Sequence, residues 1–123
     1  MQKSQQTSRI NDVLYYIHKD ISKDLPAKEL AALAAYSEQH FHRVFKVVVG
    51  ESVHQYIRRA RMEFAANQLM FDTSSTVLDI ATKAGFSSLS SFGRVFKSTF
   101  GLSPGEWRFS QFQPQSKPCL EDA

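Results

Sequence analysis

The stretch SVHQYIRRARMEFAANQLMF, residues 52–71, decides the fold. It contains no helix-breaking residue, and Ser52 stands three positions before Gln55, which is the spacing of a capping box. At 1.5 Å per residue such a helix would run roughly 30 Å. Its apolar residues change sides midway, from one face (Val53, Tyr56, Ile57, Ala60 and Phe64) to the opposite face (Met62, Ala65, Ala66 and Leu69). This change predicts a linker helix that packs against two different helical units.

The composition suits one small domain or two very small ones, because the chain has 123 residues, 42% of them hydrophobic. A net charge of +3 permits an anionic partner without requiring one. The only cysteine is Cys119, which excludes a disulfide framework and a cysteine-based metal site. The N-terminus lacks the apolar core of a signal peptide, and no apolar run reaches membrane-spanning length. We therefore expect a cytoplasmic protein without a membrane partner.

Helix start and stop signals divide the chain into helices, and no strand pattern appears. Pro26, Ser37 and the pair Thr76 and Asp79 mark helix starts, and Ser87 or Ser88 opens a later helix. The fold class expected is all-α, with seven helices in two helix-turn-helix subdomains. The expected segments are a flexible N-terminus at 1–7, a first subdomain at 8–51, the linker helix at 52–71, a second subdomain at 72–109 and a disordered tail at 110–123.

An internal repeat is the most informative pattern. The segment FHRVFK at 41–46 recurs as FGRVFK at 92–97, and AY at 35–36 matches GF at 85–86 with one residue inserted in the second turn. Each copy reads as helix, tight turn, helix, which is typical of a helix-turn-helix. A duplicated hairpin used only for packing would explain the apolar side of the second helix (Phe41, Val44, Phe45 and Val48), but not its other face.

That other face is polar in both copies. The first copy presents Gln39, His42, Arg43 and Lys46, and the second presents Leu89, Ser90, Gly93, Arg94 and Lys97. Such side chains reach base edges or phosphates. A single polar helix face is usually just solvated, but two matched faces on the second helices of a repeated unit favour DNA binding.

The sequence resembles the DNA-binding domain of the AraC/XylS family of bacterial transcription regulators, from about Ile10 to Arg108. The most specific residues are Arg61, Met62, Ala65, Leu69, Asp79, Ile80, Ala81, Gly85, Phe86, Phe92, Arg94, Phe96, Lys97, Gly101, Ser103 and Pro104. The resemblance implies a protein that binds double-stranded DNA as a monomer, with recognition helices at about 38–49 and 88–100 in adjacent major grooves.

The resemblance also implies which positions face bases: Gln39, His42, Arg43, Ser90, Ser91 and Arg94. We expect a second set at the DNA backbone: Ser37, Lys46, Arg58, Arg59, Ser87 and Lys97. A regulator of this kind has RNA polymerase as a further candidate partner.

Two departures from the family pattern concern the first unit. Ala35 stands where glycine is common, which predicts strain in the turn, and Pro26 lacks the capping hydroxyl that Thr76 supplies in the second copy. The chain resembles the small single-domain members of the family. Two alternatives are a C-terminal DNA-binding fragment of a larger effector-responsive regulator, and a helical protein-interaction module that has lost DNA binding.

Other candidate chemistry is weak. His40, His42 and His54 have no cysteine or carboxylate to complete a metal site, so we expect no metal and no cofactor. No nucleophile, base and orienting group occur together, so we expect no enzyme. Arg61 is expected to pair with an acid such as Asp79, and Cys119 is expected to be incidental.

Overall fold

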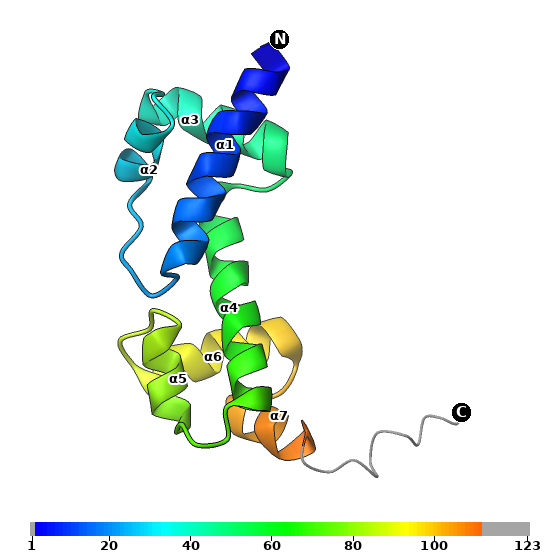
Figure 1. Ribbon diagram of the computed structural model, residues 1–123. Coiled ribbons are helices and arrows are strands. Elements are labelled where there is room, and N and C mark those ends of the chain that lie inside the picture. Colours follow the sequence, from blue (N-terminus) through cyan, green and yellow to red (C-terminus); the bar gives the residue numbers. More distant parts are fainter. Residues whose placement is uncertain (1, 112–123) are drawn as a thin grey trace, which may run out of the picture. The chain divides into compact units, whose positions relative to one another are not determined.

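Figure 1 shows the computed structural model, which describes residues 2–111. That part of the chain contains seven α-helices and no strand, so the expected all-α fold is confirmed. The helices are α1 (Gln2–Lys19), α2 (Ala27–Leu33), α3 (Glu38–Val49), α4 (Val53–Phe71), α5 (Val77–Lys83), α6 (Leu89–Phe100) and α7 (Pro104–Gln111). Within this range, none of the helices combines the length and the apolar character that crossing a bilayer requires.

The chain divides into two compact units, Met1–Ala60 and Arg61–Ala123. The boundary lies inside α4, the helix that was expected at 52–71 between subdomains at 8–51 and 72–109. Its first part belongs to the first unit and the rest to the second. A helix that serves two cores needs apolar residues on two faces, which is the pattern that its sequence carries.

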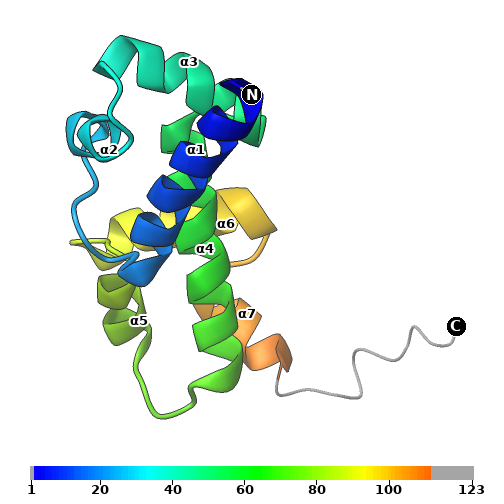
Figure 2. The ribbon, with the colours of Figure 1, turned by 45° about the horizontal axis from the view of Figure 1, so that its top comes forward.

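In the first unit, α1 and α2 both pack against α3 (Figure 2). The residues that form this core are Ile10, Val13, Ile17, Leu30, Ala31, Ala34, Phe41, Val44, Phe45, Val53, Ile57 and Ala60. Val48, expected in the core, is only half-buried. Helix α1 begins at Gln2, so residues 2–7, which were expected to form a flexible N-terminus, are helical. Glutamine and lysine are good helix formers, which lets the amphipathic helix extend toward the N-terminus.

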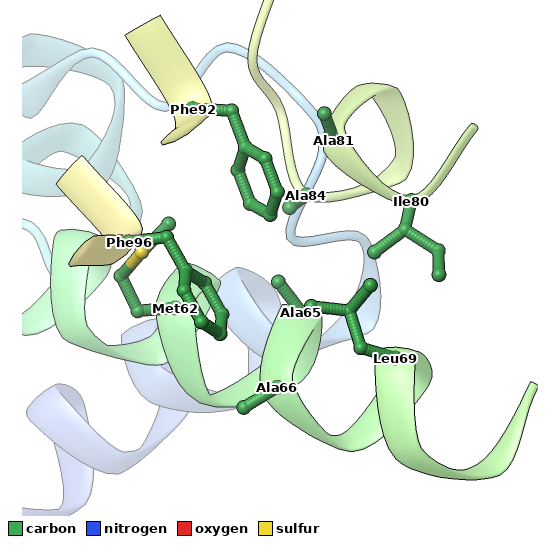
Figure 3. Packing of buried hydrophobic residues seen from close by; sticks show 9 residues of the cluster. All are labelled: Met62, Ala65, Ala66, Leu69, Ile80, Ala81, Ala84, Phe92 and Phe96. Carbon is green, nitrogen blue, oxygen red and sulfur yellow. The ribbon is translucent and has the colours of Figure 1, made fainter. Parts of the chain in front are cut away.

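In the second unit, Phe92 and Phe96 of α6 are fully buried against α4 and α5 (Figure 3). The complete cluster is Met62, Ala65, Ala66, Leu69, Ile80, Ala81, Ala84, Phe92 and Phe96. Ala65 has no exposed surface, because its small side chain lets the phenylalanine rings approach the helix closely. Phe64 packs against this same cluster, although the helical period assigned it to the face of the first unit.

The helix-to-helix turns of the two units share one hydrogen-bond pattern. The residue after the turn donates its N–H to the carbonyl five residues earlier, as in a Schellman motif. The two bonds are Tyr36 to Ala31 at 3.0 Å and Phe86 to Ala81 at 2.9 Å. Ala35 and Gly85 adopt the left-handed conformation that this motif requires, so the strain expected at Ala35 has a structural basis.

Most helix starts follow the expected capping pattern. Reciprocal capping bonds join Ser52 with Gln55 and Thr76 with Asp79. Pro26 occupies the N-cap of α2 without a side-chain bond, as expected. At the other end of the chain, α7 includes Ser110 and Gln111, so the tail expected from 110 begins with helical residues. The rest of that tail, with Cys119, lies outside the described residues.

Candidate nucleic-acid interface

Helices α3 and α6 carry the matched polar faces, and each buries its opposite side. Phe41 and Phe45 of α3 have no exposed surface, and the same holds for Phe92 and Phe96 of α6. The bounds of α3 are those expected. Helix α6 begins one residue later than expected, because Ser88 is its N-cap and not its first helical residue. The buried phenylalanines fix which side of each helix faces solvent.

Both helices have a serine as N-cap and a glycine as C-cap. The hydroxyl of Ser37 accepts the backbone N–H of the third residue of α3 at 3.2 Å, and Ser88 does the same for α6 at 3.0 Å. Gly50 and Gly101 end the helices with φ angles of +97° and +83°, which a residue with a Cβ rarely adopts. These local signals set the register of the two exposed faces.

Three polar residues on the outer face of α3 are exposed to solvent: Gln39, Arg43 and Lys46. His42 is partly covered, with 38% of its side chain exposed, and its Nε2 lies 3.9 Å from Oε2 of Glu38. The face is therefore basic, with one carboxylate at its N-terminal edge.

Two further histidines, His40 and His54, lie close to residues of this face. The ring of His54, at the start of α4, lies 5.7 Å from that of His42 between centroids, and Nη2 of Arg43 lies 3.4 Å from Nδ1 of His40. Among the residues that the structure describes, no group of three His, Cys, Asp or Glu side chains is placed to hold a metal ion. His54 and His40 are thus neighbours of His42 and Arg43, respectively.

An open hollow of about 480 Å³ lies on this face, lined by His42, Arg43, Lys46 and Val47. Val47 is 79% exposed, although it is apolar. Sequence reasoning missed it, because it stands in a run of three valines that continues the apolar side of the helix. The signal that identifies it is its position one turn after Arg43, on the polar face.

The exposed face of α6 is less polar than that of α3. Ser90, Arg94 and Lys97 are exposed, whereas Ser91 and Gly93 are half-buried. The backbone N–H of Ser91 donates to the hydroxyl of the N-cap Ser88 at 3.0 Å. The structure thus brings Ser90 and Arg94 together on one exposed side and leaves Ser91 less accessible.

The residues expected at the DNA backbone differ in their surroundings. Ser37 and Ser87 are exposed. Arg58 is exposed and forms no hydrogen bond or ion pair with the residues that the structure describes. Arg59 forms an ion pair with Glu51, and its Nε donates to the same carboxylate at 3.1 Å. Of the two arginines, Arg58 is the one with a guanidinium available to a phosphate.

Arg61 lies inside the second unit, against the turn between α5 and α6. A Cβ built on Gly85 would lie 3.0 Å from Nε of Arg61 and 3.1 Å from its Cζ. The carboxylate of Asp79, the expected partner of Arg61, accepts the backbone N–H of Thr76 at 3.1 Å. The pairing of Arg61 with Asp79 stays a prediction.

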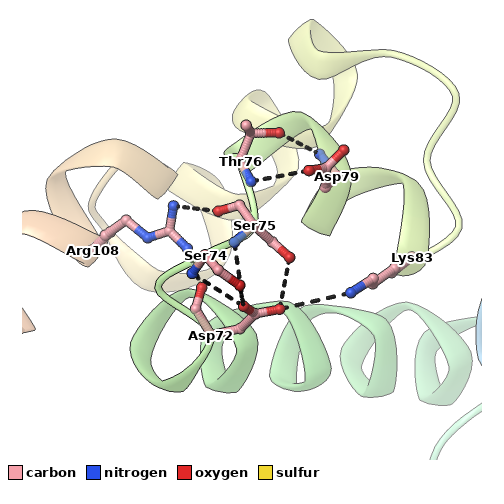
Figure 4. A network of polar contacts seen from close by, with 7 residues as sticks. All are labelled: Asp72, Ser74, Ser75, Thr76, Asp79, Lys83 and Arg108. Carbon is pink, nitrogen blue, oxygen red and sulfur yellow. Dashed lines mark hydrogen bonds and ion pairs between the residues drawn. The ribbon is translucent and has the colours of Figure 1, made fainter.

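Sequence reasoning also missed Arg108 of α7. Its guanidinium donates to the backbone carbonyls of Asp72 at 2.6 Å and Ser75 at 2.8 Å (Figure 4). It also donates to the carbonyl of Leu69 at 3.3 Å. Carbonyls at a helix C-terminus lack intrahelical partners, and a cation satisfies both their hydrogen bonds and the helix dipole. Arg108 therefore ties α7 to the end of α4 and to the turn that follows.

The side chain of Asp72 organises the same turn from within. Its carboxylate accepts the hydroxyls of Ser75 at 2.7 Å and Ser74 at 3.0 Å, and Lys83 lies 3.7 Å away (Figure 4). The bonds from Ser75 and Ser74, followed by the charge of Lys83, hold the pKa of Asp72 below its usual value. The network positions α5, the first helix of the second helix-turn-helix.

Comparison with known proteins identifies the same kind of domain. A helix-turn-helix domain model matches residues 30–110. The chain is 37% identical over 105 residues to the HTH-type transcriptional activator AarP of Providencia stuartii, covering 85% of this chain and 77% of AarP. It is 34% identical over 103 residues to the probable transcriptional regulator LumQ of Photobacterium leiognathi. This match covers 82% of this chain but only 41% of LumQ. A transcriptional regulator from Chromobacterium violaceum with an AraC-type DNA-binding domain shares the fold, with a TM-score of 0.78 at 24% identity over 87% of this chain and 95% of that one.

Two helix-turn-helix units, each with a basic second helix, define a DNA-binding domain. The chain belongs to the AraC/XylS family of helix-turn-helix transcription regulators.

Proposed function

We propose that the chain regulates transcription by binding one DNA sequence, with α3 and α6 each inserted into a major groove. The observation that carries this proposal is the matched exposure of Arg43 with Arg94 and of Lys46 with Lys97, on helices whose other side is buried. Arginine reads guanine edges through two hydrogen bonds, and lysine meets phosphates as a point charge. Each helix thus carries one arginine suited to a base contact and one lysine suited to a phosphate contact.

Base contacts are assigned in this proposal to Gln39, His42, Arg43, Ser90, Ser91 and Arg94. The exposure of Gln39, Arg43, Ser90 and Arg94 supports their assignment most directly. Half-buried Ser91 has the weakest support. Backbone contacts are assigned to Ser37, Lys46, Arg58, Arg59, Ser87 and Lys97. Arg59 would have to exchange its bond to Glu51 for one to a phosphate, so Arg58 is expected to contribute more.

One chain is proposed to occupy an asymmetric site as a monomer, because both reading helices belong to the same chain and the unbroken helix α4 contributes residues to both units. Major-groove faces of one duplex recur every ~34 Å. The proposal places the protein in the cytoplasm, with DNA as its partner and RNA polymerase as the second partner through which transcription changes. No catalytic step is proposed.

The test is selection of bound duplexes from a random library, followed by footprinting and mass measurement of the complex. We expect one preferred sequence, one protein per duplex, and an affinity that falls linearly with salt on logarithmic axes. Binding without sequence preference would contradict the proposal that the chain is a sequence-specific regulator. An absence of salt-dependent DNA binding would favour a protein-interaction module.

A matched pair of variants separates the recognition helix from general charge. Lys46→Ala and Lys19→Ala each remove one exposed lysine, but only Lys46 lies on α3. Lys46→Ala should reduce the salt slope by about 1, and Lys19→Ala should leave it unchanged. Equal slopes for both variants would contradict the assigned orientation of α3.

A further inference from the structure

Gly93 lies inside α6 at a position where the fold does not require glycine. It lies outside the left-handed region in which Gly50, Gly85 and Gly101 are found. A Cβ built on it would meet no atom within 4 Å. Neither backbone conformation nor packing therefore requires glycine, which destabilises a helix interior relative to alanine. The missing side chain leaves free space for a Cβ at the half-buried Gly93, beside the exposed Arg94.

Leu89 lies one turn before Gly93 and is 47% exposed. The repeat shows how close these two positions are, because Glu38 and His42 hold them in α3 and approach each other to 3.9 Å. In α6 the same strip carries an apolar side chain, that of Leu89, beside a residue without a side chain, the half-buried Gly93. It can form no side-chain hydrogen bond with a base edge.

The chemistry of the major groove identifies what such a strip accepts. The C5 methyl group of thymine is the apolar group that base pairs present there, and side chains in the first turn of a recognition helix approach base edges closely. A glycine lets another group come near the helix backbone, where any Cβ would keep it away. Leucine opposite a polar base edge would instead leave donors or acceptors unpaired.

We propose that Leu89 and Gly93 form a contact site for the methyl group of one thymine in the half-site bound by the second unit. This inference rests on the proposed function, because it requires α6 to lie in the major groove. Arg94, next to Gly93 in sequence and exposed, would read a neighbouring base, and Lys97 would hold the backbone. The second unit then selects sequence through shape and an apolar contact more than through hydrogen bonds.

The test removes the methyl group alone. In a duplex selected by the unaltered protein, each thymine under the second unit is replaced in turn by deoxyuridine. One replacement should weaken binding about fourfold, which is the value of one buried methyl group. Leu89→Ala should bind the thymine and uracil duplexes equally. Leu78→Ala is the matched control, because Leu78 is 52% exposed in the same unit and should keep the discrimination.

A second variant tests the close approach. Gly93→Ala should raise the Tm by roughly 5 °C, since alanine favours the helix and has free space. It should weaken binding to the selected duplex by about tenfold, because the new methyl group occupies the place of the thymine methyl. Tighter or unchanged binding with a raised Tm would overturn the inference.

The outcomes separate this inference from the function on which it rests. If a sequence is selected but no uracil replacement matters, or if Leu89→Ala keeps the discrimination, the methyl site is wrong and the DNA-binding function stands. If no sequence is selected, the proposed function fails and this inference fails with it.

Discussion

Ala35 and Gly85 occupy the same left-handed position in the two helix-to-helix turns, with φ angles of +61° and +92°. A residue with a Cβ held in this region costs of order 1–3 kcal/mol, whereas glycine adopts it freely. The same turn is therefore strained in the first unit and relaxed in the second. The strain lies directly before α3, the helix with the more polar exposed face.

Ala35→Gly should stabilise the first unit by about 1 kcal/mol. Relief of the strain exceeds the entropy that glycine adds to the unfolded chain. Chemical denaturation should show a higher midpoint, and amide exchange should slow in α2 and α3. Ala32→Gly is the control, because Ala32 is an exposed residue inside α2 and should lose stability. A lower midpoint for Ala35→Gly would mean that the turn is not strained.

Gly85→Ala should destabilise the second unit by about 1–3 kcal/mol, the opposite of the change at Ala35. The new Cβ must adopt the left-handed conformation and also displace the guanidinium of Arg61, which would lie 3.0 Å away. Combining Gly85→Ala with Arg61→Ala removes the contact and leaves only the backbone term. Additive losses in this double variant would show that the contact contributes nothing.

Ala60→Asp and Ala65→Asp should damage different units. Ala60 is 7% exposed in the first unit and Ala65 is fully buried in the second. A charge placed at either site should cost several kcal/mol. Hydrogen exchange should locate the loosening in residues of the corresponding unit. Asn67→Asp, on an exposed side of α4, should affect neither. Equal loosening of both units by both variants would indicate one shared core.

Asp72 should make the stability of the second unit depend on acid pH. Its folded-state pKa is lowered, so its contribution is complete above its ordinary value of 3.8 and is lost as the pH falls through the lowered pKa. Asp72→Asn should destabilise the protein at neutral pH, and the difference should disappear in strong acid. Asp12→Asn, an exposed change in α1, should leave the curve unchanged. A constant difference at all pH values would exclude this role of the charge.

The two units should contribute unequally to sequence choice. Arg43→Ala should relax specificity over a few base pairs, because a bidentate base contact discriminates by roughly 1–3 kcal/mol. Ser90→Ala should change little, and Lys97→Ala should weaken all sequences alike while lowering the salt slope by about 1. Base-by-base binding profiles of the three variants measure this. The asymmetry is wrong if both half-sites carry equal information.

Much of the fold could be predicted because its signals are local. The capping boxes at Ser52 and Thr76, the serine caps of α3 and α6 and the glycines that end them all act within one helical turn. The internal repeat is visible in the sequence, and it located the polar faces of α3 and α6. The start of α1 was misplaced because its first residues have good helix propensity but little apolar signal.

The candidate site was predicted less completely than the fold. The positions of Gln39, Arg43 and Lys46 on one face follow from the helical period. The position of Val47, four residues after Arg43, follows from the same period, but an apolar residue in a run of valines gives no chemical sign that it is exposed. Gly93 was visible in the sequence, but only the space around it shows that packing does not require it.

By itself, the sequence determined the helices, their ends, the duplication and the basic face of each second helix, since all of these arise from residues within a turn or two of one another. Tertiary structure alone decided that Phe64 joins the second core, that α4 divides at Ala60, and that Arg108 binds the end of α4. The carbonyls that Arg108 reaches lie 33 to 39 residues away in the chain. No local pattern encodes such contacts, because they form only when packing brings distant backbone to the same place.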